Sequence, residues 1–499
     1  MTKIATSVPG LDEVLLGGFV LGGFYLLQGD PGSGKTTIAL QYLQGRAKAG
    51  ERALFITLTE SRTDLTNIAN SHGWSTDGIA ICDLVRPARS ASIEPSVYHP
   101  SDTELGDIVK AVAAEVDRVK PSQVVFDGVS ELRLVSGDPL RYRRQLLWLK
   151  EFFAEQGATV LLLDDRSSPF GGIQPESLVG GNIVLERTLP LYGRARRRLS
   201  VTKVRAASFR EGYHEYDILT GGVVVHPRLV AAEHHDRFSA RLTASGIEQL
   251  DEMLEGGLAS GTTTLLLGPA GVGKSTISMQ YVVNALVSGQ KAAVYIFDEV
   301  MGTLIERSEK LCLRKEGGLR SYIAERVLHV QQIDPAEMTP GAFAQEVRRA
   351  VDAGAAIIVI DSLNGYMNAM PEEKFLTTHL HELFAYLNQK GVTTIMVVAQ
   401  HGLVIGTGSP GDVDISYLAD TVLLFRYFEA RAEIHQAISV FKHRTGPHER
   451  SLRQLKVDRD GVQVGQKLAD FSGIITGLAE YQGHAEMLTD RGNGKTETR

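Results

Sequence analysis

Short apolar segments alternate with amphipathic segments along both halves of the chain. In the first half, the apolar segments predict strands at residues 25–28, 53–58, 123–126, 159–163 and 198–204, with helices such as 105–119 and 140–156 between them. In the second half, the same alternation predicts strands at 263–267, 292–297, 356–360, 393–399 and 436–442. This pattern is typical of the α/β class, in which a mainly parallel sheet is flanked by helices.

The two halves repeat each other at a nearly constant distance. The segment Leu-Asp-Glu at 11–13 recurs at 250–252, and the glycine pair at 17–18 recurs at 256–257, in each case 239 positions later (250 − 11 = 239). A repeat of this length indicates two copies of one domain rather than a solenoid. We therefore predict a first domain at 1–227, a polar linker at 228–240, a second domain at 241–477 and a tail at 478–499 that is disordered at its end.

A glycine-rich loop follows the first apolar strand of each copy and opens a helix. Both loops fit Gly-x4-Gly-Lys-Ser/Thr in the strand–loop–helix context of a phosphate-binding loop. Backbone N–H groups and the helix N-terminus bind phosphates, the lysine neutralises them, and the hydroxyl ligates Mg²⁺. We therefore predict ATP and Mg²⁺ as cofactors. The predicted nucleotide-binding residues are Gly29, Gly32, Ser33, Gly34, Lys35, Thr36 and Thr37 in the first copy, and Gly268, Gly271, Val272, Gly273, Lys274, Ser275 and Thr276 in the second.

A buried apolar strand in each copy ends in an aspartate. Asp127 follows Val-Val-Phe, and Asp361 follows a run of four isoleucines and valines. An aspartate in this place is often only a helix cap, but here one accompanies a phosphate loop in both copies. We therefore predict that Asp127 with Thr36, and Asp361 with Ser275, hold Mg²⁺.

Hydrolysis also requires a base that orients the attacking water. Glu60 and Glu299 each follow the strand after the phosphate loop, and the carboxyl ends of parallel strands face the ligand-binding crevice. The alternative interpretation is a helix N-cap or an exposed strand end. We predict that both glutamates activate water.

This arrangement resembles the RecA superfamily and, within it, the KaiC family. The RecA-like feature is a glutamate on the strand after the phosphate loop. The two-copy layout and the segments at 10–18 and 250–257 resemble KaiC, the circadian-clock ATPase of cyanobacteria, over residues 4 to 477. The resemblance implies two tandem RecA-like P-loop NTPase domains and a homo-oligomer, a ring hexamer with ATP bound between neighbouring subunits.

Two Lys-x-Arg segments acquire a role from this resemblance. In the family, this strand end reaches the phosphates bound by the adjacent subunit, where cations supplied in trans stabilise transition-state charge. Each segment could otherwise be an ordinary charged strand end, but the two occupy the same place in the repeat. The residues with this predicted role are Lys203, Arg205, Lys442 and Arg444.

The second copy keeps more of the family's catalytic features than the first. The family's catalytic pair is two adjacent glutamates, whereas this chain has Thr59-Glu60 in one copy and Asp298-Glu299 in the other. Family members phosphorylate themselves on an adjacent serine and threonine of the second domain. Ser416 matches the serine, but Tyr417 stands in the threonine position, so we expect autophosphorylation on Ser416 without a two-site cycle.

One further position is expected to make the two nucleotide sites unlike each other. Gln400 follows the strand at 393–399 and is predicted to sense the γ-phosphate. The position aligned with it in the first copy is taken to be Asp165.

Composition narrows the functional class. The 499 residues suffice for two or three domains, and 43% hydrophobic with 22% charged residues is typical of a soluble globular protein. No apolar run approaches the ~20 residues of a membrane span, the N-terminus lacks a signal-peptide core, and only two cysteines are present. We therefore predict a cytoplasmic protein that does not act at a membrane.

Three functional hypotheses follow. The first is a Mg²⁺-dependent ATPase and serine autokinase that acts as a signalling or timing oligomer. The second is a RecA- or helicase-like DNA motor, which the net charge of −7 and the absence of a basic, aromatic-rich loop disfavour. The third is a scaffold whose assembly is controlled by bound nucleotide without kinase activity.

Overall fold

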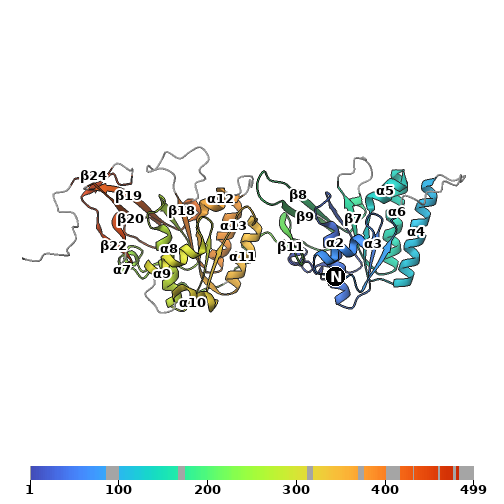
Figure 1. Ribbon diagram of the computed structural model, residues 1–499, viewed down its shortest axis with the longest axis horizontal. Helices are drawn as coiled ribbons and strands as arrows, with labels where there is room; N and C mark the ends of the chain where they lie inside the picture. Colours follow the sequence, from blue (N-terminus) through green and yellow to red (C-terminus); the bar gives the residue numbers. More distant parts are fainter. Residues whose placement is uncertain are drawn as a thin grey trace, which may run out of the picture. The chain divides into compact units, whose positions relative to one another are not determined.

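A computed structural model describes residues 2–85, 100–166, 175–235, 237–311, 318–368, 376–399, 416–430, 432–458, 461–475 and 479–482. The chain divides into two compact units, Met1–Arg228 and Leu229–Arg499. Figure 1 shows each unit as a sheet with helices on its faces. The predicted class, two tandem α/β domains of RecA-like type, is confirmed.

The sheet of the first unit has a parallel centre and an antiparallel edge. Among the described residues it has nine strands in the order β11-β10-β9-β8-β3-β7-β6-β4-β5, in which β8 through β5 run parallel and β9 to β11 are added antiparallel. The strands are β3 (Phe24–Gly29), β4 (Ala53–Thr57), β5 (Ile79–Asp83), β6 (Gln123–Asp127), β7 (Thr159–Asp165), β8 (Gly181–Thr188), β9 (Arg196–Val204), β10 (Tyr213–Leu219) and β11 (Gly222–His226).

The sheet of the second unit repeats this plan. Its order is β16-β15-β17-β18-β14-β19-β20-β21-β22, with the same parallel centre and antiparallel edge. The strands are β14 (Thr263–Gly268), β15 (Lys291–Ile296), β16 (Leu328–Gln332), β17 (Ala355–Asp361), β18 (Thr393–Ala399), β19 (Thr421–Ala430), β20 (Glu433–His443), β21 (Arg453–Asp458) and β22 (Gly461–Lys467).

Helices cover both faces of each sheet. In the first unit they are α1 (Leu11–Val14), α2 (Lys35–Lys48), α3 (Arg62–Ser71), α4 (Pro100–Val119), α5 (Val129–Ser136) and α6 (Pro139–Glu155). In the second they are α7 (Glu248–Met253), α8 (Lys274–Val287), α9 (Met301–Leu311), α10 (Gly318–Ala324), α11 (Pro340–Asp352), α12 (Leu363–Asn368) and α13 (Leu376–Gln389). Within the described ranges, no helix is long and apolar enough to cross a bilayer.

The central strands are buried on both faces, which explains their nearly continuous apolar sequences. Along β3, Tyr25 and Leu27 pack into one core cluster, whereas Phe24 and Leu26 pack into another on the opposite face. The first cluster lies under α2 and the second under α4, α5 and α6. Since successive side chains of a strand point to opposite faces, both layers are needed to bury β3.

Part of the segment predicted as a linker packs onto the second unit. Leu229 and Ala231 are buried in a core cluster of that unit, and the backbone N–H of Ala231 donates to Glu382 Oε2 at 3.1 Å. The domain boundaries themselves stay predictions. Short elements complete the chain: β1 (Lys3–Ile4), β2 (Phe19–Val20), β12 (Leu242–Thr243), β13 (Leu258–Ala259), β23 (Phe471–Ser472), β24 (Glu480–Tyr481), and the 3₁₀ turns η1 (Pro175–Ser177), η2 (Ala231–Glu233) and η3 (Ser416–Leu418).

Candidate functional site

The two predicted phosphate loops have the same backbone conformation. Each lies between the central strand, β3 or β14, and the helix that follows it. Gly32 and Gly271 both have φ of 77°, and Gly34 and Gly273 both have φ of 99°. These left-handed conformations suit glycine, and they let successive N–H groups turn toward a common point. The geometry fits the phosphate-binding role predicted for both loops.

The lysines of the two loops have different partners. Lys35 Nζ donates to the carbonyl of Gly29 at 2.7 Å and to Asp165 Oδ1 at 2.6 Å. Lys274 Nζ donates to the carbonyls of Gly268 at 2.8 Å and Pro269 at 2.6 Å. Among the described residues no carboxylate forms an ion pair with Lys274, and burial lowers the pKa of this lysine to about 8, although Asp361 opposes the shift.

Strand register locates the position that corresponds to Asp165. Asp165 pairs with Gly29 across β7 and β3, whereas Ala399 pairs with Gly268 across β18 and β14. The counterpart of Asp165 is therefore Ala399, and the alignment of Asp165 with Gln400 was wrong by one residue. Gln400 itself lies outside the described residues, so its role as a γ-phosphate sensor stays a prediction.

The aspartates predicted to hold Mg²⁺ lie at the carboxyl ends of β6 and β17, beside the phosphate loops. A hydrogen bond with Ser275 lowers the pKa of Asp361, although burial raises it more. In the first unit, burial and the nearby Glu60 raise the pKa of Asp127 to about 7. One buried carboxylate with one loop hydroxyl fits Mg²⁺, which keeps several waters and takes its other ligands from phosphates.

Glu60 lies beyond its strand rather than at its end. The sequence predicted a strand over 53–58 with Glu60 close to its end, whereas β4 ends at Thr57 and a bend follows. Thr57 Oγ1 accepts from the backbone N–H of Glu60 and donates to its carbonyl, both at 2.9 Å. Burial and Asp64 raise the pKa of Glu60, while Thr36 and Lys35 oppose the shift. The carboxylate is therefore tied to the loop residues, as a base for water requires.

Both carboxylates of the acidic pair in the second unit, Asp298 and Glu299, accept hydrogen bonds from other side chains. Glu299 Oε2 accepts from Arg307 of α9 at 3.0 Å. Asp298 accepts a short hydrogen bond from the hydroxyl of Ser362, the residue after Asp361. Thr59 and Gly128 stand in the first unit where the second has Asp298 and Ser362, so this hydrogen bond has no counterpart there. The two sites thus differ in the groups that surround the base.

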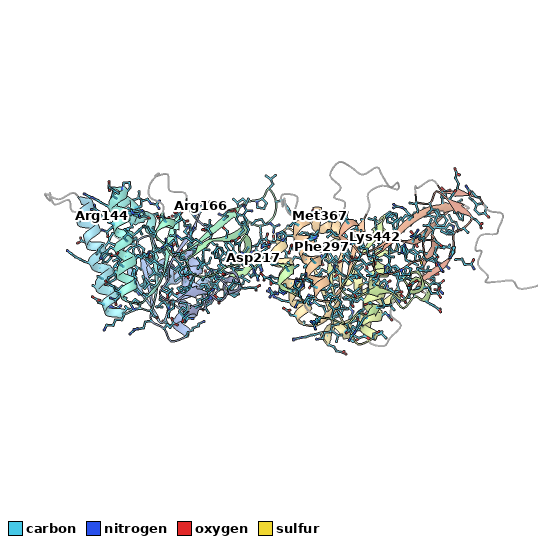
Figure 2. The ribbon with its side chains drawn as sticks, turned by 180° about the vertical axis from the view of Figure 1, so that it is seen from behind. Arg144, Arg166, Asp217, Phe297, Met367 and Lys442 are labelled. Atoms are coloured by element: carbon cyan, nitrogen blue, oxygen red, sulfur yellow. The ribbon has the colours of Figure 1, made fainter. Side chains whose placement is uncertain are left out.

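The Lys-x-Arg segments lie away from the phosphate loop of their own unit. Lys203 pairs with Asn182, which pairs with Leu26 of β3, three residues before Gly29. Lys442, labelled in Figure 2, pairs with Val422, which pairs with Leu265, three residues before Gly268. Three residues of strand span about 10 Å. Both lysines therefore lie level with the middle of the central strand, about 10 Å along the sheet from the end that carries the loop.

Backbone carbonyls hold both segments in the same manner. Lys203 Nζ donates to the carbonyl of Glu176 at 2.8 Å, and Lys442 Nζ donates to the carbonyl of Ala419 at 2.6 Å. Arg205 donates to the carbonyl of Ser177 at 3.2 Å, whereas Arg444 lies 3.5 Å from Asp420. In each unit these acceptors belong to the 3₁₀ turn before β8 or β19, or directly follow it.

The predicted phosphoacceptor lies at the start of this turn in the second unit. Ser416 begins η3, and its side chain is outside the described part of the structure. Its neighbour Tyr417 is 52% exposed. The backbone of Ser416 is therefore placed three residues before Ala419, the acceptor of Lys442.

The sequence analysis did not identify several residues on other strands that contact the phosphate loops. A guanidinium nitrogen of Arg187, on β8, lies 3.3 Å from the point where a Cβ on Gly32 would stand. In the second unit the hydroxyl of Tyr427 takes this place, and it donates to the carbonyl of Ala270 at 3.3 Å. Tyr216 of β10 donates to the carbonyl of Ser33 at 2.6 Å. No sequence pattern signals these contacts, because they depend on the order of strands.

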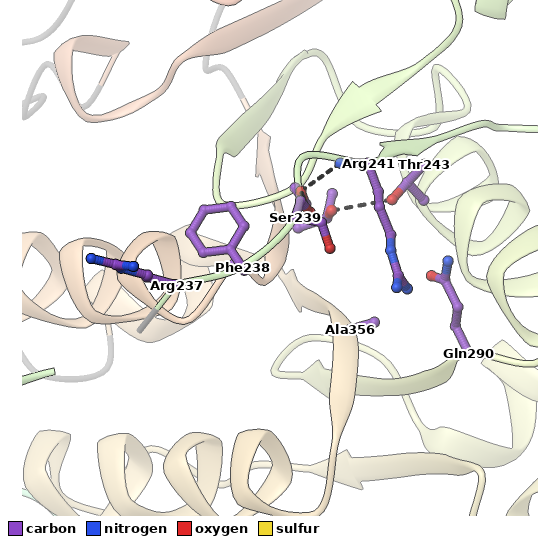
Figure 3. Close-up of a pocket in the computed structure, with 10 residues that line it drawn as sticks. Arg237, Phe238, Ser239, Arg241, Thr243, Gln290 and Ala356 are labelled. Atoms are coloured by element: carbon purple, nitrogen blue, oxygen red, sulfur yellow. Dashed lines mark hydrogen bonds between the residues drawn. The ribbon is translucent and has the colours of Figure 1, made fainter. Parts of the chain in front are cut away.

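A separate cavity of about 250 Å³ lies in the second unit (Figure 3). Its lining includes Arg241, Gln290 and Thr393. Gln290 and Thr393 are at the amino ends of β15 and β18, whereas the phosphate loop follows the carboxyl end of β14. The cavity is therefore at the other end of the sheet and is not part of the nucleotide site.

Comparison with known proteins agrees with the tandem layout. The family described as the KaiC ATPase matches residues 4–230 and again residues 243–469. The chain is 26% identical over 486 residues to the circadian clock oscillator protein KaiC of Synechococcus elongatus, covering 96% of this chain and 92% of that protein. It is 25% identical over 502 residues to the circadian clock protein KaiC3 of Synechocystis, covering 97% and 96%. Because the family matches nearly the whole chain in two tandem copies, this protein belongs to the KaiC family of ATPases and carries two KaiC domains.

Proposed function

We propose that this protein is a Mg²⁺-dependent ATPase that works as a ring oligomer, most simply a hexamer, in signalling or timing. The observation that carries the proposal is the location of the Lys-x-Arg segments. Lys203 and Lys442 lie about 10 Å back along the sheet from the loop of their own unit. A neighbouring copy must supply these cations if they are to act on the phosphates.

Within one subunit, each residue has a defined task. The loop N–H groups bind the phosphates, and Lys35 and Lys274 neutralise them. Thr36 with Asp127, and Ser275 with Asp361, would hold Mg²⁺, which neutralises charge that develops between the β- and γ-phosphates. Glu60 and Glu299 orient water and accept its proton, and the neighbour's Lys203, Arg205, Lys442 and Arg444 stabilise the transition state.

The finer part of the proposal is serine autokinase activity in the second domain. Ser416 is three residues from Ala419, whose carbonyl accepts from Lys442. If Lys442 faces the nucleotide of the next subunit, Ser416 lies on the same side of its own subunit. Asp298 and Glu299 of the neighbour would then be the bases for the serine hydroxyl.

One experiment tests assembly, hydrolysis and phosphorylation together. The purified chain is incubated with Mg²⁺ and γ-labelled ATP, and native mass spectrometry, ADP release and peptide mapping are read from the same sample. We expect an oligomer, ADP formation, and label on Ser416 that is lost in Ser416→Ala. The Ser439→Ala variant is the matched control, because Ser439 is buried within β20.

Each outcome bears on a separate part of the proposal. A chain that stays monomeric with Mg²⁺ and ATP contradicts the shared site. Hydrolysis in an oligomer without label on Ser416 contradicts the kinase and leaves a plain ATPase. Tight ATP binding with no turnover in either unit would favour the nucleotide-controlled scaffold.

A further inference from the structure

The first phosphate loop contains an ion pair that the second lacks. Asp165 Oδ1 lies 2.6 Å from Lys35 Nζ, and the side chains are 41% and 12% exposed, respectively. Its counterpart in the second unit is Ala399, which has no charge. The lysine that should neutralise the γ-phosphate therefore already holds an internal carboxylate in the first unit.

Asp165 and its neighbour Asp164 make different contacts and therefore have different roles. Asp164 is buried, where it accepts from Arg133 at 3.2 Å and from Gln28 at 3.4 Å. These contacts account for Asp164 as a structural residue. Asp165 points to the opposite face of the sheet, where it contacts Lys35 of the loop, as expected for adjacent residues of one strand.

Carboxylates other than Asp165 also lie near Lys35 in the first site. Asp127 is influenced by Glu60 and Asp165 as well as by Lys35, so three carboxylates and one lysine share the same field. A γ-phosphate that enters this field meets repulsion from Asp165 and must displace it from Lys35. A diphosphate, which leaves the γ-position empty, avoids most of both costs.

We propose that Asp165 competes with the γ-phosphate for Lys35, so that the first site favours ATP over ADP less strongly than the second site does. The inference rests on the proposed role of both loops in nucleotide binding. Asp165 acts as a specificity-determining residue, because it selects between nucleotides through the loop lysine.

The test uses the full chain with one loop disabled at a time. In a Lys274→Ala background, titration with fluorescent ATP and ADP in the presence of Mg²⁺ reports the first site. Asp165→Asn removes the charge and keeps the shape. We expect it to raise the ratio of ATP affinity to ADP affinity about three- to tenfold, as for one partly exposed charge pair. Asp165→Glu keeps the carboxylate, and its ratio should stay near that of the parent.

The reciprocal substitution tests the proposed competition by introducing a carboxylate into the second site. In a Lys35→Ala background, Ala399→Asp places a carboxylate at the corresponding position beside Lys274. We expect the ATP-to-ADP affinity ratio of the second site to fall by a similar factor. Thermal unfolding without nucleotide shows whether each variant is folded, and the reciprocal variant decides the matter if Asp165→Asn fails to fold.

The results separate this inference from the proposed function. An unchanged ratio in both Asp165→Asn and Ala399→Asp, with clear nucleotide binding, contradicts the inference alone. A lower ratio in Asp165→Asn also contradicts it, because Asp165 would then assist the γ-phosphate. If the Lys274→Ala and Lys35→Ala/Lys274→Ala chains bind nucleotide equally, the role of the first loop fails, and the inference fails with it.

Discussion

Arg307 Nη2 lies 3.0 Å from Glu299 Oε2, so that the predicted base of the second site is held by a cation from the next helix. The position 239 residues earlier in the first unit is Ile68, an apolar residue that packs against the core. Glu60 therefore has no cation in this place. The two sites are constrained at different groups, the lysine in the first and the base in the second.

Removal of this constraint should speed hydrolysis in the second site. Arg307→Met in a Lys35→Ala background frees Glu299 and should raise kcat up to about fivefold, since a partly exposed ion pair is worth up to about 1 kcal/mol. KM for ATP should change little, because Arg307 contacts the base and not the loop. Steady-state phosphate release measures both.

The matched control lies on the same helix. Lys310→Met removes the exposed ion pair with Glu306 and should leave kcat unchanged. A fall in kcat for Arg307→Met, with Lys310→Met unaffected, would show instead that Arg307 positions Glu299 for catalysis.

Subunits with complementary defects should restore each other. A chain with Lys35→Ala and Lys442→Ala keeps the second loop but supplies no trans lysine, whereas Lys35→Ala with Lys274→Ala has the reverse defect. Each should be nearly inactive alone. In a ring of random composition mixed one to one, about a quarter of second sites combine an intact loop with an intact neighbour, and ATPase activity should return to that extent.

Native mass spectrometry of the mixture must show that subunits have exchanged. With exchange established, a mixture that remains inactive would place Lys442 in the site of its own subunit. The sheet register argues against that outcome, because Lys442 lies about 10 Å along the sheet from the loop of its own unit.

The Mg²⁺ requirement should depend jointly on Ser275 and Asp361. Asp361→Asn removes the carboxylate charge, and Ser275→Ala removes its hydrogen-bond partner, so each should weaken Mg²⁺-dependent ATP binding about 10- to 100-fold. Because these groups interact directly, the double variant should lose less than the product of the two effects. Titration of Mg²⁺ at fixed ATP in a Lys35→Ala background measures the requirement, and strictly multiplicative losses would deny a shared role.

Acid should destabilise the first unit through His214. This fully buried ring accepts from the backbone N–H of Arg228 at Nδ1 and donates to the carbonyl of Arg210 from Nε2, so it is held neutral. Burial lowers its pKa from 6.5 to about 4, and the charges of Arg210 and Arg228 act in the same direction, although the Arg210 carbonyl and Glu13 oppose the shift. The unfolded chain binds this proton below pH 6.5 and the native chain only below about 4. Stability is therefore complete above pH 6.5 and decreases by up to about 3 kcal/mol as the pH falls to 4.

Denaturant unfolding at several pH values checks this effect. His214→Gln does not titrate, so its unfolding free energy should be lower near neutral pH but should fall less between pH 6.5 and 4. Carboxylates elsewhere titrate equally in both proteins and cancel in the comparison. Parallel curves for the two proteins would remove His214 as the cause.

Local patterns predicted the parts of the fold that depend on short segments. The glycine loops, the strands before them and the apolar strands that end in Asp127 and Asp361 are all readable from spacing. The strand β10 of the antiparallel edge was not predicted, because polar residues interrupt its apolar pattern, and the more buried strands β8 and β11 were missed as well. Glu60 lies in the bend that follows β4. The sequence did not reveal this bend, since the residues after β4 keep a strand-like composition.

Contacts between distant segments were beyond the reach of sequence patterns. Lys35 and Asp165 are 130 positions apart, and only the adjacency of β3 and β7 brings them together. The alignment of Asp165 failed by one residue because the distance between the copies changes before β6 and β17: Thr57 and Ile296 are 239 positions apart (296 − 57 = 239), whereas Asp127 and Asp361 are 234 apart (361 − 127 = 234). Arg307 is close to Glu299 in sequence, but one exposed arginine on a helix has no pattern that distinguishes it.

The hydrogen bond from Tyr216 to Ser33 has a mechanical consequence. Tyr216 belongs to β10, which is hydrogen-bonded to β9, and β9 carries Lys203. If Lys203 moves toward the nucleotide of the neighbouring subunit, it displaces β9. β9 pairs directly with β10, whose Tyr216 holds the phosphate loop of the same subunit. In the proposed ring, strain in one subunit would thus pass to the next subunit. The first domains would then not release and bind nucleotide independently of one another.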